Sequence, residues 1–479
     1  MEFRFSRRKM MQGVTSAALA NSLEVAAEAA PTPRQWPIME GPDTPKLSLA
    51  LGDGGGPLPA NLRPAAATPA TGAGAGGGAG GRGGGRGGGG GGYGGYLPPK
   101  PEAPAAEAPA GPGGGGGRGG GASAYERVRQ LGVTYLIGVG LGGGNGSPPT
   151  AESIGRTIQT AKDNGCVAYN AMVNVPYSII AGREGRDKDI EVVIATIEAA
   201  GKAGLPVLEY NFYAHRIIEG YYETVGRANT GYTGFDYDME VLINKDTGQL
   251  VGPIYRDANG QMTPETLAAF PDAKKVKVRD LPPLANEGTH TLTEVFANAA
   301  YFLKAVIPKA EKAGVKMALH PNDPPAPISR GSQQIMGSVD GWKHYVGLVD
   351  SPHNGITFDC GVTREMGSDA IATAEWFASR KKINHCHYRN VMVTTPYQKY
   401  QEVFIDAGMN DMFGVMKALV KNKYTGTIYP EHPKAFDADR DRLAPGGRLP
   451  GYPGGGGYTG ITFSVAYARA MMQAALESV

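Results

Sequence analysis

Short hydrophobic runs alternate along the chain with longer stretches in which apolar residues recur at helical spacing. Strands are predicted at residues 47–51, 133–139, 167–172, 206–210, 315–319, 355–358, 383–386 and 426–429. Helices are predicted at residues 151–163, 189–203, 293–313, 339–349, 369–379, 412–421 and 461–476. Strands separated by helices are typical of a parallel sheet, and eight such repeats favour closure into a (β/α)8 TIM barrel. The sequence therefore predicts an α/β protein whose barrel spans residues 45–479.

One segment of low complexity interrupts this pattern after the first predicted strand. Residues 52–121 consist largely of Gly, Pro and Ala, with Arg82, Arg86 and Arg118 among the glycines. Such a segment buries too little apolar surface to offset the entropy of ordering it, so we expect a disordered insertion. Arginines among glycines also occur in RNA-binding segments, but three widely spaced arginines make a weak RNA motif.

A second irregular segment, residues 213–286, follows the fourth predicted strand. Residues 245–248 (Lys-Asp-Thr-Gly) and 257–260 (Asp-Ala-Asn-Gly) have the composition of turns between short extended runs, which indicates a hairpin. In a barrel this segment would lie on the catalytic face. A lid over the site is one interpretation, and a structural flap without a role is the other.

The amino-acid composition indicates which kinds of binding partner the protein can have. The chain has 47 Lys and Arg residues against 45 Asp and Glu residues, so no overall field attracts nucleic acid or a membrane surface. Three cysteines exclude a dense disulfide framework, and no apolar run is long enough for an ordinary transmembrane helix. We expect a small-molecule ligand, without a nucleic acid or a membrane span, and the sequence leaves assembly into a homo-oligomer open.

The N-terminus resembles an export signal. Residues 6–11 (Ser-Arg-Arg-Lys-Met-Met) form a twin-arginine pattern, a mildly apolar stretch follows, and residues 27–29 (Ala-Glu-Ala) suit a cleavage site. Glu24 is unusual in such a segment. Residues 1–30 are therefore predicted to direct twin-arginine export to the periplasm. The alternative is an ordinary basic start on a cytoplasmic protein.

Ligand-type side chains follow four consecutive predicted strands: His320, Asp359, His387 and Glu431. The C-terminal ends of barrel strands converge on one face, so we expect these side chains to meet there. Two imidazoles and two carboxylates suit a divalent cation, with Mn²⁺ preferred and Mg²⁺, Co²⁺, Fe²⁺ or Zn²⁺ as alternatives. Cys360 competes with Asp359 as second ligand, because adjacent strand residues point to opposite faces.

Several motifs resemble the mannonate dehydratases, a family of xylose-isomerase-like barrels. Residues 319–325 (Leu-His-Pro-Asn-Asp-Pro-Pro) are similar to the family's His-Pro-Asp-Asp-Pro-Pro, and residues 387–391 (His-Tyr-Arg-Asn-Val) to its His-Leu-Arg-Asn-Val. Residues 430–432 (Pro-Glu-His) resemble its Pro-Asp-His, residues 411–419 resemble the helix before that motif, and residues 457–460 (Gly-Tyr-Thr-Gly) a late Gly-Tyr element. The resemblance is clear over residues 290–479.

The resemblance implies a hydro-lyase that converts D-mannonate to 2-keto-3-deoxy-D-gluconate with a Mn²⁺-type ion. The family ligands His, Cys, His and Asp fall on His320, Asp359, His387 and Glu431, so two of the four positions differ in residue type. Asn322 also replaces an Asp. The two ligand differences make the site resemble that of the sugar isomerases and epimerases of the wider superfamily. Isomerisation or epimerisation of a sugar is therefore the alternative activity. A non-catalytic exported carbohydrate-binding barrel is a third reading.

We also expect roles for further residues. The planar guanidinium of Arg389 suits the substrate carboxylate, and the resemblance implies that His432 and Tyr458 form the acid–base pair. The alternatives are a hydrogen bond from His432 to Glu431 and simple packing of the Tyr458 ring. His385 is expected in the core, one layer below His387. Substrate contacts are expected from three residues: Asn211, Asp323 and Asn390.

Overall fold

The structure is a computed structural model that describes residues 40–54, 123–142, 148–252, 254–257, 259–285, 287–440 and 452–479. The predicted signal (1–30) and almost all of the predicted Gly-rich insertion (52–121) lie outside the described residues. Within these ranges, no helix combines the length and the apolar character that a membrane crossing requires.

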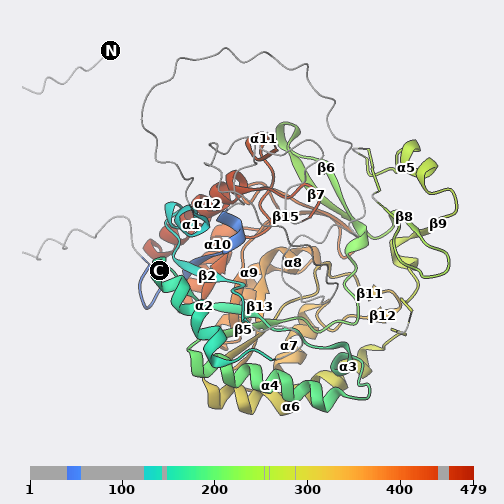
Figure 1. Ribbon diagram of the computed structural model, residues 1–479. Coiled ribbons are helices and arrows are strands. Elements are labelled where there is room, and N and C mark those ends of the chain that lie inside the picture. The colour runs from blue at the N-terminus through green and yellow to red at the C-terminus, as the bar shows by residue number, and fades with distance from the viewer. Residues whose placement is uncertain are drawn as a thin grey trace, which may run out of the picture. The chain divides into compact units, whose positions relative to one another are not determined.

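A parallel sheet of nine strands forms a nearly closed, TIM-like barrel (Figure 1). Its strands are β1 (Lys46–Ala50), β2 (Tyr135–Ile137), β3 (Val167–Ala168), β4 (Asn170–Met172), β5 (Val207–Tyr210), β10 (Lys316–Leu319), β13 (Asn354–Asp359), β14 (Ile383–His387) and β17 (Thr427–Tyr429). The order runs β3-β2-β1-β17-β14-β13-β10-β5-β4. Its two end members are pieces of the single strand predicted at 167–172, and only Tyr169 separates them. The sheet therefore returns to its own start, as the strand pattern predicted.

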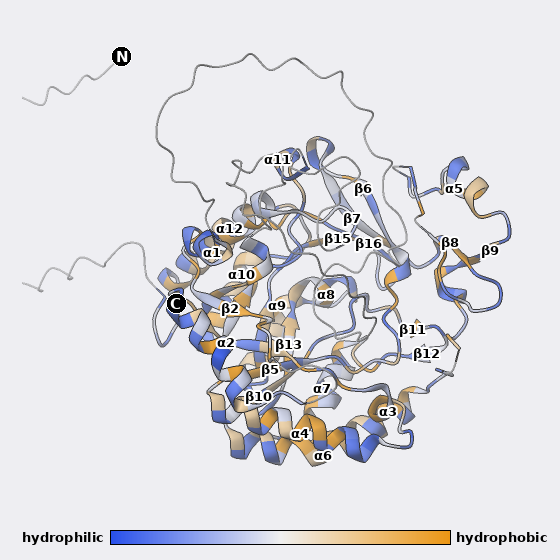
Figure 2. Ribbon diagram, viewed as in Figure 1, coloured by the Kyte–Doolittle hydropathy of each residue, from blue (hydrophilic) through white to orange (hydrophobic). Residues whose placement is uncertain are grey.

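Helices surround this sheet: α1 (Ala124–Gln130), α2 (Ala151–Asp163), α3 (Tyr177–Ile180), α4 (Arg186–Ala203), α6 (Leu292–Ala313), α7 (Val339–Gly347), α8 (Cys360–Glu365), α9 (Ala370–Ser379), α10 (Met412–Lys421), α11 (Asp437–Arg440) and α12 (Tyr458–Glu477). Capping boxes at Thr150 and Thr291 begin α2 and α6. Hydrophobic and hydrophilic residues alternate along α2, α4 and α6 (Figure 2), which lets one side of each helix pack inward.

The segment predicted as an excursion folds into β-structure at one end of the barrel (Figure 1). Strands β6 (Tyr221–Val225) and β7 (Gly231–Asp236) join β15 (Val391–Thr395) and β16 (Lys399–Glu402) in a four-stranded antiparallel sheet. Strands β8 (Glu240–Ile243) and β9 (Lys274–Lys277) pair beside α5 (Pro264–Ala269), and β11 (Ile328–Ser329) pairs with β12 (Ser332–Gln333). The predicted turn at 245–248 is confirmed, because Ile243 and Leu250 form an antiparallel bridge.

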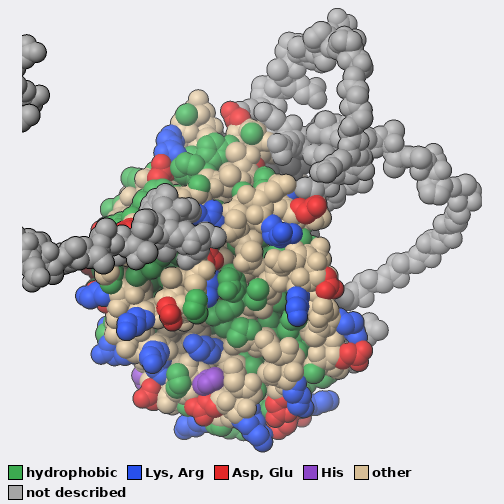
Figure 3. Space-filling model, turned by 90° about the vertical axis from the view of Figure 1, so that its left-hand side faces the viewer, with side chains coloured by type: hydrophobic (Ala, Val, Ile, Leu, Met, Phe, Trp, Pro, Cys, Tyr) green, Lys and Arg blue, Asp and Glu red, His purple; other side chains and the backbone are tan. Residues whose placement is uncertain are grey.

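The surface agrees with the near-balance of charge in the sequence. Figure 3 shows the face on the left of Figure 1, where basic and acidic side chains are interspersed around a small hydrophobic area. No single sign of charge gathers on that face. Charged side chains also gather around Arg389, where the barrel strands end.

Candidate metal centre and active site

Four strand ends bring their polar side chains close to one another. His320 follows β10, Asp359 and His387 end β13 and β14, and Glu431 lies two residues beyond β17. The rings of His320 and His387 have centroids 4.9 Å apart. Nδ1 of His387 lies 2.9 Å from Oε1 of Glu431 and 3.9 Å from Oδ2 of Asp359. One ligand atom each from Asp359, His387 and Glu431 can lie within 4.8 Å of the others, which is a spacing that one cation can bridge.

Asp359 rather than Cys360 faces this cluster. Oδ1 of Asp359 caps α8 by accepting from the amide of Val362 (2.9 Å), and Oδ2 accepts from Nε of Arg389 (3.1 Å). The helix cap and the guanidinium together hold the carboxylate in place. The thiol of Cys360 instead donates to the carbonyl of Arg389 at 3.2 Å. Burial raises the pKa of that thiol above its ordinary value, so it stays protonated.

Arg389 is the centre of a buried group of charges. Its guanidinium lies within 3.6 Å of five carboxylates: Asp323, Asp359, Glu365, Glu402 and Glu431. The shortest contact is 2.6 Å, from Nη1 to Glu365. Burial by itself would lower the pKa of Arg389, but these carboxylates raise it well above its usual value. Nη2 makes no hydrogen bond within the described part of the chain, so this arginine keeps one donor available.

Burial and neighbouring charges also determine the protonation of His320 and His387. Burial lowers the pKa of His320 to about 3, and its Nδ1 lies 2.8 Å from the carbonyl of Pro321. A neutral ring that donates from Nδ1 to this carbonyl leaves the lone pair on Nε2. Burial would also lower the pKa of His387, but the carboxylates of Glu431, Glu209 and Asp359 raise it above its usual value.

The donor set fits a divalent cation. Five buried carboxylates surround Arg389, and the cationic side chains that contact them are only Arg216, Arg389 and Lys434 among the described Lys and Arg residues. Ionised carboxylates are costly in a buried site, and burial raises the pKa of Asp359 to about 6. Nδ1 of His387 is buried without a hydrogen bond in the described structure, although it lies close to Glu431. A bound divalent ion would use that nitrogen and favour the ionised form of the neighbouring carboxylates.

His432 lies beside this cluster. Its Nδ1 lies 3.0 Å from Oε1 of Glu402, and its Nε2 lies 3.5 Å from Oε2 of Glu431. The backbone of His432 has φ 47°, which is uncommon for a residue other than Gly. Glu402 also accepts from Nζ of the buried Lys434 at 2.9 Å. His432 and Lys434 outweigh burial and lower the pKa of Glu402, so this carboxylate stays ionised.

A tyrosine that the sequence analysis did not select packs against His432. The ring of Tyr452 meets that of His432 edge to face, with centroids 4.7 Å apart, and its hydroxyl contacts the Arg216 guanidinium. Tyr458, the predicted partner of His432, is placed differently. Its hydroxyl donates to the carbonyl of Arg127 at 2.9 Å, and no contact joins it to the cluster in the described structure.

The three predicted substrate contacts also differ in their surroundings. Asp323 lies inside the cluster, where Oδ1 accepts from the Tyr221 hydroxyl at 2.6 Å and Oδ2 lies 3.3 Å from Nη2 of Arg216. Asn211 lines an open cavity beside the cluster. The amide of Asn390 is used within the fold, because it donates to the carbonyl of Ile405 and accepts from the amide of Asn410, both at 3.0 Å. His385 is fully buried, as predicted.

Four further residues of the site lie outside the sequence motifs, and the sequence analysis did not select them. Glu209 lies within β5, accepts from the Thr357 hydroxyl at 2.8 Å and lies 3.7 Å from Nε2 of His387. A carboxylate inside an otherwise apolar predicted strand is a signal that could have identified it. Glu365 lies in α8 and Glu402 ends β16, where the sequence shows no such signal. Tyr452 has the same Gly-Tyr context as Tyr458.

Comparison with known proteins identifies relatives of this chain. The model of the family "D-mannonate dehydratase (UxuA)" matches residues 117–477. A mannonate dehydratase of Streptococcus equi subsp. zooepidemicus is 32% identical over 285 residues, which cover 58% of this chain and 71% of that protein. One from Thermotoga petrophila is 28% identical over 330 residues, which cover 66% and 87%. The crystal structure of the Streptococcus suis serotype 2 mannonate dehydratase matches 74% of this chain and 91% of that one, with a TM-score of 0.55 at 25% identity.

Proposed function

The chain belongs to the D-mannonate dehydratase family, and from that premise we propose that it removes water from D-mannonate to give 2-keto-3-deoxy-D-gluconate. The observation that carries the proposal is the match of the family model to residues 117–477, which include all four side chains of the metal centre. The activity is that of a hydro-lyase. The substrate is a small sugar acid.

We propose that His320, Asp359, His387 and Glu431 hold the divalent cation, and that this cation is Mn²⁺. The proposal rests on their convergence and on the mixture of imidazole and carboxylate donors. When bound, the cation supplies positive charge that favours the negative charge developing on the substrate as its C2 proton leaves. Cys360 is excluded from this set in our proposal, because its thiol is turned to the carbonyl of Arg389.

The substrate carboxylate needs a cation of the protein as well. Nη2 of Arg389 is buried, makes no hydrogen bond within the described residues and lies 3.6 Å from Asp323. It can donate to a carboxylate oxygen while Nε and Nη1 remain on Asp359 and Glu365. Asp323 can accept from a substrate hydroxyl at the same place.

Loss of water requires removal of the C2 proton and protonation of the departing C3 hydroxyl. We assign these two steps to His432 and Tyr452, which contact each other at the edge of the cluster. Glu402 accepts from Nδ1 of His432 and leaves Nε2 to exchange a proton with the substrate. Arg216 contacts the Tyr452 hydroxyl and can hold it in position.

The test is incubation of the metal-loaded full chain with D-mannonate, followed by measurement of the 2-keto-3-deoxy acid and of solvent deuterium at C2. Metal analysis of the purified protein identifies the ion. Turnover of neutral ketoses, with no dehydration of any aldonate, would replace the proposal by a sugar isomerase or epimerase activity.

We also propose that residues 1–30 direct export by the twin-arginine route. The proposal rests on the pattern around Arg7 and Arg8 alone. Fractionation of cells that express the full chain should place the protein in the periplasm, and replacement of both arginines by lysine should retain it in the cytoplasm. An unchanged distribution would contradict export by this route.

A further inference from the structure

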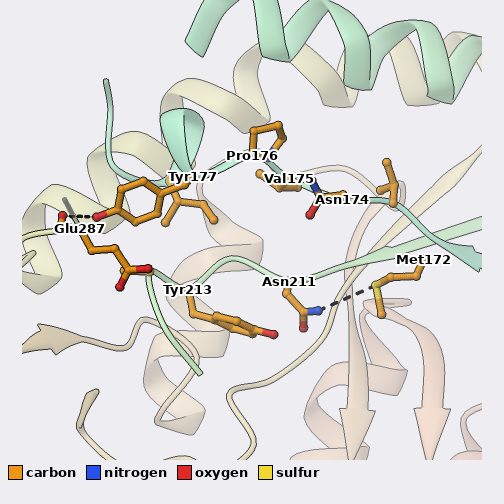
Figure 4. Close-up of a pocket in the computed structure, with 11 residues that line it drawn as sticks. Met172, Asn174, Val175, Pro176, Tyr177, Asn211, Tyr213 and Glu287 are labelled. Atoms are coloured by element: carbon orange, nitrogen blue, oxygen red, sulfur yellow. Dashed lines mark hydrogen bonds between the residues drawn. The ribbon is translucent and has the colours of Figure 1, made fainter. Parts of the chain in front are cut away.

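A cavity of about 430 Å³ opens between the segments that follow β4 and β5. One wall is the segment from Met172 to Tyr177, which connects β4 to α3, and the other is the segment from Asn211 to Ala214 after β5 (Figure 4). Glu287 closes one end, below the Tyr177 ring. A cavity of this volume has the size of a typical small-molecule site and exceeds what the last carbons of a six-carbon acid would fill.

The end of β5 links the cavity to the candidate metal centre. The carbonyl of Tyr210 accepts from the amide of His320 at 2.8 Å, and the next residue, Asn211, lines the cavity. Tyr213 lines the cavity as well. Burial raises the pKa of its hydroxyl, and the nearby charges of Arg216 and Asp323 respectively lower and raise that pKa. A substrate held at the cluster would reach this space by extending along the end of β5.

The lining combines apolar surface with a few hydrogen-bonding groups. Val173, Val175, Pro176 and Ile180 supply the apolar part, while the amides of Asn174 and Asn211 and the Glu287 carboxylate supply donors and acceptors. None of the described residues that line the cavity is Lys or Arg. The cavity therefore suits a neutral group that carries hydroxyls and C–H faces, rather than a second acid.

The wall that contains Tyr177 is held in place before any ligand arrives. The Tyr177 hydroxyl donates to the carbonyl of Glu287 and lies 2.7 Å from Nε2 of His290. The guanidinium of Arg183 donates to the same carbonyl at 2.6 Å and lies 4.8 Å above the Tyr177 ring. A preformed wall lowers the entropic cost of binding, which favours a dedicated subsite.

We propose that this cavity binds a neutral sugar unit attached to the sugar acid, so that the enzyme acts on glycosylated aldonates. The inference rests on the proposed function, because the acid end of the ligand is placed at the metal centre. The reaction at C2 and C3 is unchanged: the glycosyl group is attached at O4 or O6 and stays on the product.

The experiment compares D-mannonate with 4-O- and 6-O-glucosyl D-mannonate on the Mn²⁺-loaded full chain. We expect one glucosyl acid to have a kcat/KM at least tenfold above that of D-mannonate. Its Kd, measured by calorimetry in the inactive His432→Asn background, should be lower by a similar factor. Asn174→Trp places a large ring in the cavity from an exposed position and should remove both gains, with D-mannonate unaffected. Lys188→Trp, exposed on α4, is the matched control.

Equal kcat/KM and Kd values for the two kinds of acid would overturn the proposal. An equal gain for 6-O-hexyl D-mannonate would also overturn it, since the cavity would then be a general apolar pocket. If no acid loses water but a glucosyl acid still binds more tightly, the dehydratase activity fails and the sugar subsite stands. If D-mannonate is dehydrated and the glucosyl acids bind no better, the dehydratase activity stands and the sugar subsite fails.

Discussion

The ring of His432 packs edge to face against the ring of Tyr452, with the two centroids 4.7 Å apart. The contact joins the residue after Glu431 to a tyrosine in a Gly- and Pro-rich segment twenty positions later. It places a second group able to transfer a proton next to His432, whose Nε2 lies 3.5 Å from Oε2 of Glu431. Tyr458, six residues further on, lies against α1 instead.

Tyr452→Phe should therefore lower kcat for D-mannonate by about 100- to 10,000-fold, which is the usual contribution of a general acid or base. The metal content should stay unchanged, because the hydroxyl is not a ligand. Tyr458→Phe is the matched control and should keep nearly full activity, since it loses one hydrogen bond to a backbone carbonyl. Formation of the 2-keto-3-deoxy acid is the assay. The opposite ranking of these two variants would return the catalytic role to Tyr458.

Asp359 and Cys360 are adjacent and should differ sharply on substitution. Asp359→Ala removes a carboxylate that lies 3.9 Å from His387, and we expect loss of bound metal and of activity. Cys360→Ser should keep both, because the thiol is protonated and turned to the carbonyl of Arg389. Metal analysis after dialysis distinguishes the two variants. Metal loss in Cys360→Ser alone would mean that the thiol is the ligand.

Arg389→Met should destabilise the protein as well as inactivate it. Five carboxylates lie within 3.6 Å of this guanidinium, and removing one partner of a buried ion pair typically costs about 3–5 kcal/mol. Arg389→Lys keeps the charge and should lose less stability, although it cannot reproduce the three-sided pattern of donors. Urea unfolding of the metal-free proteins measures the difference. A metal-free Arg389→Met variant as stable as the wild type would show that the carboxylates are protonated in the folded state.

The two described ends of the Gly-rich segment meet. A Cβ added to Gly54 would lie 2.6 Å from the carbonyl oxygen of Ala124, and the Arg127 guanidinium donates to the carbonyl of Gly54. Deletion of residues 55–120 leaves three residues to span this short gap, so folding and turnover should change little. A Gly-Ser segment of the original length is the control. Loss of soluble protein on deletion, with rescue by the original segment only, would give that segment a structural role.

The sequence predicted the parts of this protein that depend on local pattern. The period of apolar residues located the strands, because each strand buries its side chains wherever its neighbours lie. Strand ends share one face in any parallel barrel, so His320, Asp359, His387 and Glu431 could be grouped without knowing the strand order. The alternation of side chains along a strand showed only that Asp359 and Cys360 could not both face the site, and the resemblance to the family motif favoured Asp359.

Tertiary structure alone decided which distant residues complete the site. Gly451-Tyr452 and Gly457-Tyr458 look alike in sequence, and only the path of the chain brings Tyr452 to His432. Glu402 reaches His432 from the antiparallel sheet over the barrel mouth, and Glu365 reaches Arg389 from a helix. Local periodicity records whether a residue is buried. It does not indicate which distant residue will contact the buried one, because those contacts form only when the barrel closes.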